Sequence, residues 1–474
     1  MNELLALTLI QLTEAIKSRK TSPVELMEAV LSRIDETNPE LNAVVAMRDR
    51  EALMADASEA EKRVMRGEAR PLEGIPFGVK DLEDAEGLVT SMGSVPFRDA
   101  VAERDSDQVS RLRAAGAILL GKTNAPEFGY TAITKNLVYG VTRSPWNLER
   151  TPGGSSGGSS AALSACMLPL VTGSDGGGSV RIPASFTGAF GLKPSFGRIS
   201  MGPRKRWSYA DTSVFGPITK TVEDGAFFLD QVAGPSPSDP NTLPHPGFSY
   251  LEKLQEPWDK TLRIGYSADL GYAAVQSDVA AAVQEGVRAF DEMGNKIEEI
   301  KEGPPAIGAE WGMLGSFELA GSLHTLLPEH EKEFGRAFLA GVKTGWNVTP
   351  EWWGEAARKR EQLNAWCAEI FERVDLLITP TVPFDPPPAR GPFPEEIDGR
   401  KLVPPGVAAF TIPFNLSWHP AATVRVGLSD ADLPIGMQIV GPRHRDDLVL
   451  RAARAFEVER PWHPNWPTTW NPLT

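Results

Sequence analysis

One lysine and two serines lie in three separate glycine-rich motifs of this 474-residue chain. Lys80 stands in GIPFGVKD, Ser155 in TPGGSSGGS and Ser179 in GSDGGGSVRIP. A neutral amine can accept a proton from one hydroxyl, and that hydroxyl can then activate the second. Such a proton relay contains no histidine. It suits acyl transfer, in which a serine attacks an amide or ester carbonyl and forms a covalent acyl-enzyme.

The glycines before Ser179 make this residue the candidate nucleophile. Gly176, Gly177 and Gly178 have no side chains, so their N–H groups and that of Ser179 can converge on one point. Backbone donors arranged in this way form an oxyanion hole, in which one donor contributes about 3 kcal/mol to the transition state. We therefore expect the backbone of residues 176–179 to bind the developing oxyanion.

Lys80 is the candidate base of the relay. It follows the apolar run Ile75 to Val79, which predicts a short strand that carries the lysine into the interior. Burial disfavours the charged ammonium and so lowers the pKa of a lysine. Neutral Lys80 would take a proton from Ser155, and Ser155 would take one from Ser179. The proton would return through Ser155 to the leaving amine, and water would then release the acyl group by the same route.

The segments around these motifs alternate between helical and strand patterns. Ser22 to Glu25 has the capping box and the proline of a helix start, and Asn38-Pro39 is expected to end that helix. Leu4 to Leu12 fits one amphipathic helix. Ala421 to Val426 and Leu433 to Val440 fit a hairpin. The alternation predicts an α/β fold in which helices cover a sheet, and the hairpin predicts that the sheet is mixed.

Composition excludes several classes of protein. The net charge of −14 argues against direct binding of nucleic acid. Two cysteines, Cys166 and Cys367, are too few for a disulfide framework. The N-terminus lacks the features of a signal peptide, and no apolar run approaches the roughly 20 residues that span a membrane. We expect a cytoplasmic protein with neither a nucleic-acid nor a membrane partner.

Three other patterns suggest chemistry that their context does not support. Gly116 to Thr123 satisfies the P-loop pattern, but its middle residues are apolar and predict a strand instead of a phosphate-binding loop. Gly153 to Gly157 satisfies the nucleophile-elbow pattern of Ser-His-Asp hydrolases, but SPWNLERTP precedes it where a strand is needed. The six histidines show no metal-ligand spacing. We expect no cofactor and no metal site.

The three motifs, in this order and with 75 positions from Lys80 to Ser155 and 24 from Ser155 to Ser179, resemble the amidase signature family of hydrolases. The resemblance begins at SPVELMEAVLSRIDETNPELNAVV (22–45), continues through GLKPSFGRIS (191–200) and ends with LPIGMQIVGP (433–442). It implies a single α/β/α domain over residues 1–474 with a mixed central sheet. Within that domain it implies N-terminal helices in 1–65, a catalytic core in about 66–230 and 375–474, and a variable substrate-pocket region in about 300–420.

The resemblance also implies roles for residues beside the relay. The aligned bond Gly154–Ser155 would be a cis peptide, and Ser156 would support the site through hydrogen bonds. Asp175 and Arg181 flank the nucleophile and are expected to pair and hold its loop. The supporting residues are therefore expected to be Ser156, Asp175, Arg181 and, as a lining residue of the substrate cleft, Thr151.

A tryptophan-rich segment bears on the substrate. Residues 300–420 contain six of the twelve tryptophans: Trp311, Trp346, Trp352, Trp353, Trp366 and Trp418. They fit either ordinary core packing or the wall of a pocket for an apolar acyl or aryl group. The second interpretation predicts a hydrophobic, aryl-bearing amide, carbamate or ester as substrate. A monomer and a homodimer both fit the sequence.

Two positions depart from common family patterns. Gly176 stands where a bulkier residue, often threonine, is usual, which would loosen the oxyanion loop or widen the pocket. Ser213 stands where many relatives carry an acidic residue, which argues against the amidase subunit of a glutamyl-tRNA(Gln)-type amidotransferase. A third alternative is a catalytically silent interaction module. The presence of all three relay residues argues against such a module, and Ser213 together with the tryptophan-rich segment favours a hydrolase that acts alone.

Overall fold

The computed structural model describes residues 3–203, 211–404 and 406–462, and it contains two main sheets. The smaller sheet has the order β1-β3-β2-β6 and the larger one the order β10-β8-β16-β17-β13-β11-β12. In both, parallel and antiparallel pairs occur together, and their edge strands β6 and β10 contact each other. The predicted α/β fold with mixed sheet structure is confirmed.

The strands of the smaller sheet are β1 (Val44–Met47), β2 (Pro76–Lys80), β3 (Ile118–Thr123) and β6 (Leu170–Val171). Those of the larger sheet are β8 (Phe190–Lys193), β10 (Ile218–Thr219), β11 (Arg263–Tyr266), β12 (Lys296–Glu299), β13 (Leu376–Pro380), β16 (Ala421–Leu428) and β17 (Pro434–Val440). A short pair, β7 (Ser174–Asp175) and β9 (Val214–Phe215), lies at the motif of Ser179. The antiparallel β16–β17 pair confirms the predicted hairpin.

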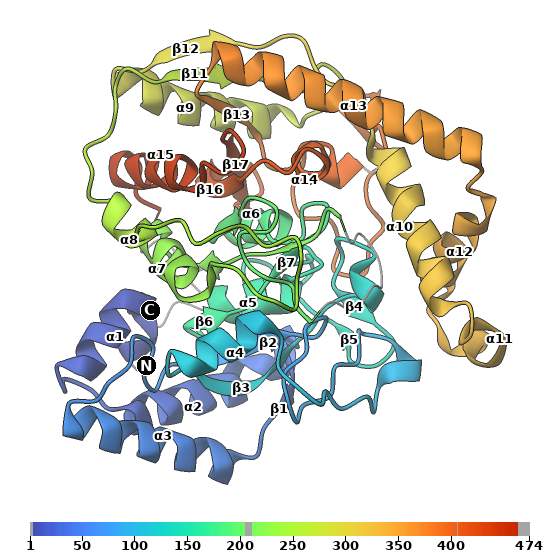
Figure 1. The fold of residues 1–474 in the computed structure, drawn as a ribbon. Helices are drawn as coiled ribbons and strands as arrows, with labels where there is room; N and C mark the ends of the chain where they lie inside the picture. Colours follow the sequence, from blue (N-terminus) through green and yellow to red (C-terminus); the bar gives the residue numbers. More distant parts are fainter. Residues whose placement is uncertain (1–2, 204–210, 405, 463–474) are drawn as a thin grey trace.

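Helices surround these sheets, and Figure 1 shows α1 to α3 gathered at one end of the molecule and α10 to α13 at another. The N-terminal group is α1 (Leu9–Lys17), α2 (Pro23–Leu41) and α3 (Arg50–Arg66). The helices of the middle and the C-terminal part are α4 (Asp107–Ala114), α5 (Gly157–Ser164), α6 (Arg181–Thr187), α7 (Val222–Val232), α8 (Tyr250–Lys253), α9 (Ser277–Glu292), α14 (Ile412–Leu416) and α15 (Asp446–Glu459). The remaining group is α10 (Gly308–Leu323), α11 (Leu327–His330), α12 (Arg336–Thr344) and α13 (Pro350–Arg373). Over the described ranges, no helix combines the length and the apolar character needed to cross a membrane.

Helix α2 begins as predicted but ends later. The Ser22 hydroxyl accepts the Glu25 N–H (3.1 Å) and the Glu25 carboxylate accepts the Ser22 N–H (2.8 Å), which completes the capping box. The prediction that Asn38-Pro39 ends the helix is wrong. The Asn42 N–H still bonds the Asn38 carbonyl (2.7 Å), so Pro39 lies inside the last turn.

The N-terminal residues form two helical segments where one was predicted. A 3-10 turn covers Glu3–Ala6, and α1 starts anew at Leu9. The break occurs because Thr8 caps α1: its hydroxyl accepts the Gln11 N–H (3.2 Å), and its own N–H bonds the Gln11 side chain (3.0 Å). Leu5, Leu9 and Leu12 are nevertheless buried, as the apolar spacing predicted.

The segment that matches the P-loop pattern is strand β3, as the apolar residues indicated. Gly121, within it, has a packing role: a Cβ atom there would lie 2.2 Å from the Ala46 carbonyl oxygen of β1. Glycine is therefore required for the close approach of two strands. Lys122 is buried and donates to the Thr90 hydroxyl (3.2 Å) instead of facing an open loop.

Helices α10 and α12 pack over the segment that follows β3. Phe338 of α12 stacks on Phe128 with ring centroids 5.2 Å apart, and the Tyr130 and Ser316 hydroxyls share a hydrogen bond of 3.0 Å. Leu319 and Leu323 of α10 complete this small apolar cluster. Helices α10 and α12 are thus attached to residues 128–130, which follow β3.

Candidate active site

Lys80 ends β2 with its side chain fully buried. Its amine nitrogen Nζ donates to Ser155 Oγ (2.8 Å), to Ser174 Oγ (2.9 Å) and to the Ser174 carbonyl (3.2 Å). The structure therefore brings Lys80 and Ser155 into direct contact, as the sequence predicted. Ser174 was not predicted, although it stands in the same motif as Ser179, and it provides a second hydroxyl for the amine.

Burial lowers the pKa of Lys80 from 10.5 to about 7. The negative charges of Asp175 and Glu83 act in the opposite direction but do not outweigh the loss of hydration. Near neutral pH a large fraction of Lys80 is therefore the free amine, which can accept a proton.

The relay serine lies in a tightly enclosed turn. The Gly154–Ser155 peptide bond is cis, as the family resemblance implied, and Ser155 is only 3% exposed. Gly129 passes close to it with a φ of +70°; a Cβ there would lie 3.1 Å from Ser155 Oγ and 2.8 Å from Leu82. This glycine was not predicted, because nothing in its local pattern indicates contact with residue 155.

Ser179 lies half-buried in the turn before α6. Its carbonyl accepts the Ser156 N–H (3.2 Å), and the Ser156 hydroxyl donates to the Ser174 carbonyl (3.3 Å). Ser156 thus joins the two serine motifs, in agreement with its expected supporting role. Within the described chain no hydrogen bond links the side chains of Ser155 and Ser179, and such bonds often tighten only when substrate is bound.

The glycine loop before Ser179 is held from several sides. The Gly178 N–H donates to Asp175 Oδ1 (2.7 Å), which turns this donor away from any substrate in this conformation. By contrast, the N–H groups of Gly176, Gly177 and Ser179 have no acceptor among the residues that the structure describes. Of the four N–H groups predicted to bind the oxyanion, three are therefore free to do so in this conformation.

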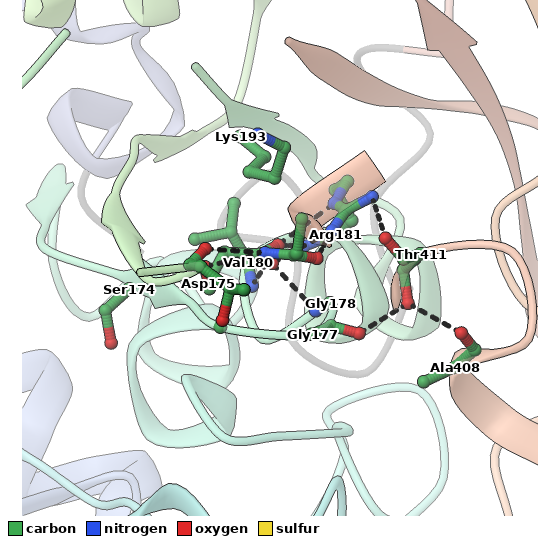
Figure 2. Close-up of polar contacts among 12 residues, drawn as sticks. Ser174, Asp175, Gly177, Gly178, Val180, Arg181, Lys193, Ala408 and Thr411 are labelled. Carbon is green, nitrogen blue, oxygen red and sulfur yellow. Dashed lines mark hydrogen bonds and ion pairs between the residues drawn. The ribbon is translucent and has the colours of Figure 1, made fainter. Parts of the chain in front are cut away.

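Two side chains from distant segments hold the carbonyls of the same loop. Thr411 Oγ1 donates to the Gly177 carbonyl (2.6 Å), and Trp311 Nε1 donates to the Gly176 carbonyl (3.0 Å). Figure 2 shows Thr411 reaching the loop from the side opposite Asp175. Because a carbonyl lies in one peptide plane with the N–H of the next residue, Trp311 restricts the peptide that carries the Gly177 N–H, and Thr411 restricts the one that carries the Gly178 N–H.

A buried ion pair anchors the loop, as expected. Arg181 donates through Nε (3.0 Å) and Nη2 (2.9 Å) to Asp175, and both side chains are fully buried. Burial alone would raise the pKa of Asp175, but the charge and hydrogen bonds of Arg181 hold it well below its usual range. Gln438 accepts from Arg181 (2.7 Å), and Asn415 donates to Asp175 Oδ1 (2.9 Å). These last two residues were not predicted, since β17 and α14 lie far away in the sequence.

Thr151 does not have the role suggested for it. Its side chain is fully buried, and its hydroxyl accepts the Gly153 N–H (3.2 Å). Its own N–H donates to the Pro387 carbonyl (3.0 Å). Thr151 shapes the loop that leads to Ser155 and does not face an open cleft.

None of the histidines that the structure describes hydrogen-bonds Lys80, Ser155 or Ser179. His419, which is buried beside Phe371, has its pKa lowered to about 3 by burial, with Arg443 adding to the effect. In the described part of the chain, no group of three or more His, Cys, Asp or Glu side chains is placed to hold a metal ion. The chemistry available at this site is that of an amine, hydroxyls and backbone donors.

Comparison with known proteins finds relatives that match almost the whole chain. A family model described as Amidase matches residues 25–450. An acylamidase from Rhodococcus erythropolis is 36% identical over 475 residues, with 96% of each chain covered. A glutamyl-tRNA(Gln) amidotransferase subunit from Geotalea daltonii is 32% identical, with 97% of this chain and 99% of the relative covered.

Solved structures match the fold closely. A bacterial aryl acylamidase of the amidase signature family superposes with a TM-score of 0.92 at 28% identity, over 99% of each chain. A 6-aminohexanoate cyclic dimer hydrolase in complex with its substrate superposes with a TM-score of 0.89 at 30% identity, over 98% of this chain and 100% of the other. The chain belongs to the amidase signature family of hydrolases. It is an enzyme of the amide-hydrolysing class.

Proposed function

We propose that Lys80, Ser155 and Ser179 form the proton relay of an amidohydrolase whose substrate is a hydrophobic, aryl-bearing small molecule. The observation that supports this most directly is the buried Lys80 amine, 2.8 Å from Ser155 Oγ, with its pKa lowered to about 7 by burial. An amine in this state can act as a base at neutral pH. The contact with Ser155 separates Lys80 from Lys193, whose pKa burial also lowers to about 7 but whose amine bonds the Pro194 carbonyl.

The relay works in two halves. Neutral Lys80 takes the Ser155 proton while Ser155 takes the proton of Ser179, whose oxygen attacks the amide carbonyl. The N–H groups of Gly176, Gly177 and Ser179 stabilise the oxyanion. The proton returns through Ser155 to the leaving amine, and the C–N bond breaks. Water then attacks the acyl-enzyme, activated by the same relay, and releases the acid.

The same chemistry extends to carbamates and esters, because they pass through a similar tetrahedral oxyanion. The aryl preference is supported by the similarity to acylamidases, one of them an aryl acylamidase, and by Trp311 beside the glycine loop. In this proposal residues of about 66–230 and 375–474 form the catalytic core. Residues of about 300–420 supply the pocket, to which Trp311 belongs. A cytoplasmic location and a monomeric or homodimeric state stay predictions from sequence.

Intact-protein mass spectrometry tests the proposal. Wild type and Ser179→Ala are incubated side by side with p-nitroanilides, aryl carbamates and primary amides. We expect an acyl adduct on wild type only, and its mass identifies the acyl group that the pocket accepts. An adduct of equal yield on Ser179→Ala would exclude Ser179 as the nucleophile. Equal turnover of acetamide and of a bulky anilide would contradict the aryl preference.

A second candidate is the amidase subunit of a tRNA-dependent amidotransferase. The 32% identity to such a protein over almost the whole chain favours it. Ser213, at the position where many of these relatives carry an acidic residue, argues against it. Hydrolysis of glutamine with no turnover of any anilide or carbamate would favour this candidate. Absence of any adduct or turnover, glutamine included, would favour the non-catalytic interaction module.

A further inference from the structure

A small pocket lies between α10 and α13, and one of its lining residues, Trp311, contacts the glycine loop. Its volume is about 150 Å³. Seven of its lining residues are apolar, namely Ile307, Trp311, Leu314, Trp353, Ala356, Ala357 and Leu416, and four are charged, namely Asp211, Glu310, Glu318 and Arg360. An apolar cavity of about 150 Å³ accommodates one benzene ring. The size and lining of this pocket therefore match a single aryl group.

Trp311 is the wall that this pocket shares with the glycine loop. Its indole N–H bonds the Gly176 carbonyl at 3.0 Å. Its ring lies so close to Gly177 that a Cβ there would be 2.4 Å from Cζ2 of the indole. Trp311 therefore connects the pocket to the loop that carries Ser179, two residues after Gly177.

Ion pairs offset part of the charge that lines the pocket. Lys359 bonds Glu310, and Arg360 bonds Asp211 while its guanidinium lies 5.6 Å from the Trp418 ring centroid. Glu310 Oε2 is buried without a hydrogen-bond partner among the described residues, so the pocket offers one acceptor beside its apolar walls.

The pocket opens to solvent on the side of Trp353. This residue is 51% exposed, and its ring meets Phe317 of α10 edge-on at a centroid distance of 6.0 Å. Ala356, one turn further along α13, is 3% exposed and forms the inner wall. A ligand can therefore enter past Trp353 and come to rest between Trp311 and Ala356.

We propose that this pocket is a subsite that holds the aryl ring of the substrate during attack by Ser179. This proposal rests on the proposed function. It adds where in the protein the aryl ring of the substrate binds and how large that ring can be. Stacking on Trp311 and burial of the ring favour binding. A ring held there also orients the scissile carbonyl, so its effect should appear in both KM and kcat.

A variant that fills the pocket tests the proposal. Ala356→Leu adds three carbons inside it, whereas Ala365→Leu adds the same group on an exposed position of the same helix and serves as the matched control. The substrates are phenylacetamide and acetanilide, compared with acetamide. We expect kcat/KM for at least one aryl amide to fall 10-fold or more in Ala356→Leu, with acetamide changed by less than twofold. Equal losses on all three amides, or none on the aryl amides, would overturn the subsite.

Direct binding gives a readout that does not need turnover. Fluorine NMR of 4-fluorobenzyl alcohol should show binding to wild type and to Ala365→Leu, and loss of binding in Ala356→Leu. The same alcohol should inhibit hydrolysis of the aryl amide competitively. Binding that persists in Ala356→Leu, or that leaves aryl amide hydrolysis unaffected, would contradict the proposal. If wild type turns over none of the amides, the proposed function fails, and the aryl site is then judged by the NMR titration alone.

Discussion

The Lys80 amine donates to the Ser174 hydroxyl at 2.9 Å, in addition to its bond with Ser155 Oγ at 2.8 Å. Ser174 also offers its carbonyl oxygen at 3.2 Å, so one residue provides two of the three acceptors of the amine. Its N–H and carbonyl both contact the Ser156 hydroxyl. Ser174 therefore determines where Lys80 lies relative to Ser155.

Replacement of Ser174 tests this positioning role. In Ser174→Ala the amine loses one acceptor, and we expect kcat to fall up to about 10-fold, the size of one ordinary hydrogen bond. Because the lost bond favours the ammonium, the midpoint of the pH–rate profile should move to lower pH. Ser174→Thr keeps the hydroxyl, so both kcat and the midpoint of the pH–rate profile should stay as in the wild type. An unchanged midpoint in Ser174→Ala would show that Ser174 does not act through Lys80.

The pH dependence of the reaction should follow the ionisation of Lys80. Burial lowers its pKa to about 7, and only the neutral amine is a base, so the active fraction increases as pH rises through about 7. We expect kcat/KM to rise from pH 6 to pH 8 and then to level off. The measurement is an initial-rate profile between pH 5 and pH 9.

A second buried lysine provides the control for this profile. Burial, together with the nearby charge of Arg181, also lowers the pKa of Lys193 to about 7. Its amine, however, donates to the Pro194 carbonyl and contacts neither serine of the relay. Lys193→Met should keep the midpoint near 7 if Lys80 is the base. Loss of the alkaline rise in this variant would assign the profile to Lys193.

The Asp175–Arg181 pair should contribute strongly to stability. Removing one partner of a fully buried ion pair leaves the other charge uncompensated, at a cost of about 3–5 kcal/mol. We expect Asp175→Asn to lower the free energy of unfolding in urea by that amount and to reduce activity, since the asparagine side chain keeps only one of the two oxygens that accept from the Gly178 and Val180 N–H groups. Glu68→Gln, which breaks a surface pair with Arg66, should leave the urea midpoint nearly unchanged. A similar midpoint for both variants would argue against the anchoring role.

The contact between Gly177 and Trp311 should limit substitution of this glycine. A Cβ in Gly177→Ala would overlap the indole, so either the loop or Trp311 must move. We expect kcat to fall about 100-fold, as when one oxyanion donor is lost. Gly312→Ala is the control on the same helix, because a Cβ there meets no atom within 4 Å. The double variant Gly177→Ala/Trp311→Leu should recover part of the loss; if it recovers none, the clash is not the cause.

Features that depend on neighbouring residues were determined by the sequence itself. The capping box at Ser22, the strand that leads into Lys80 and the β16–β17 hairpin follow from short-range patterns, because hydrogen bonding and apolar periodicity act over a few residues. The helix end at Asn38-Pro39 was predicted wrongly because the prediction considered only the tendency of proline to stop a helix. The bond from the Asn42 N–H to the Asn38 carbonyl continues α2 past Pro39.

Tertiary structure decided what surrounds those motifs. That Ser174 faces Lys80, that Gly178 points at Asp175 and that Trp311 lies on Gly177 all depend on how separate segments pack. Trp311 is 135 residues from Gly176, and no local pattern relates the two. The sequence thus determined which groups could react. Long-range packing decided which N–H groups stay free, how far Lys80 is dehydrated, and where a ring can bind, because these depend on close contact between distant parts of the chain.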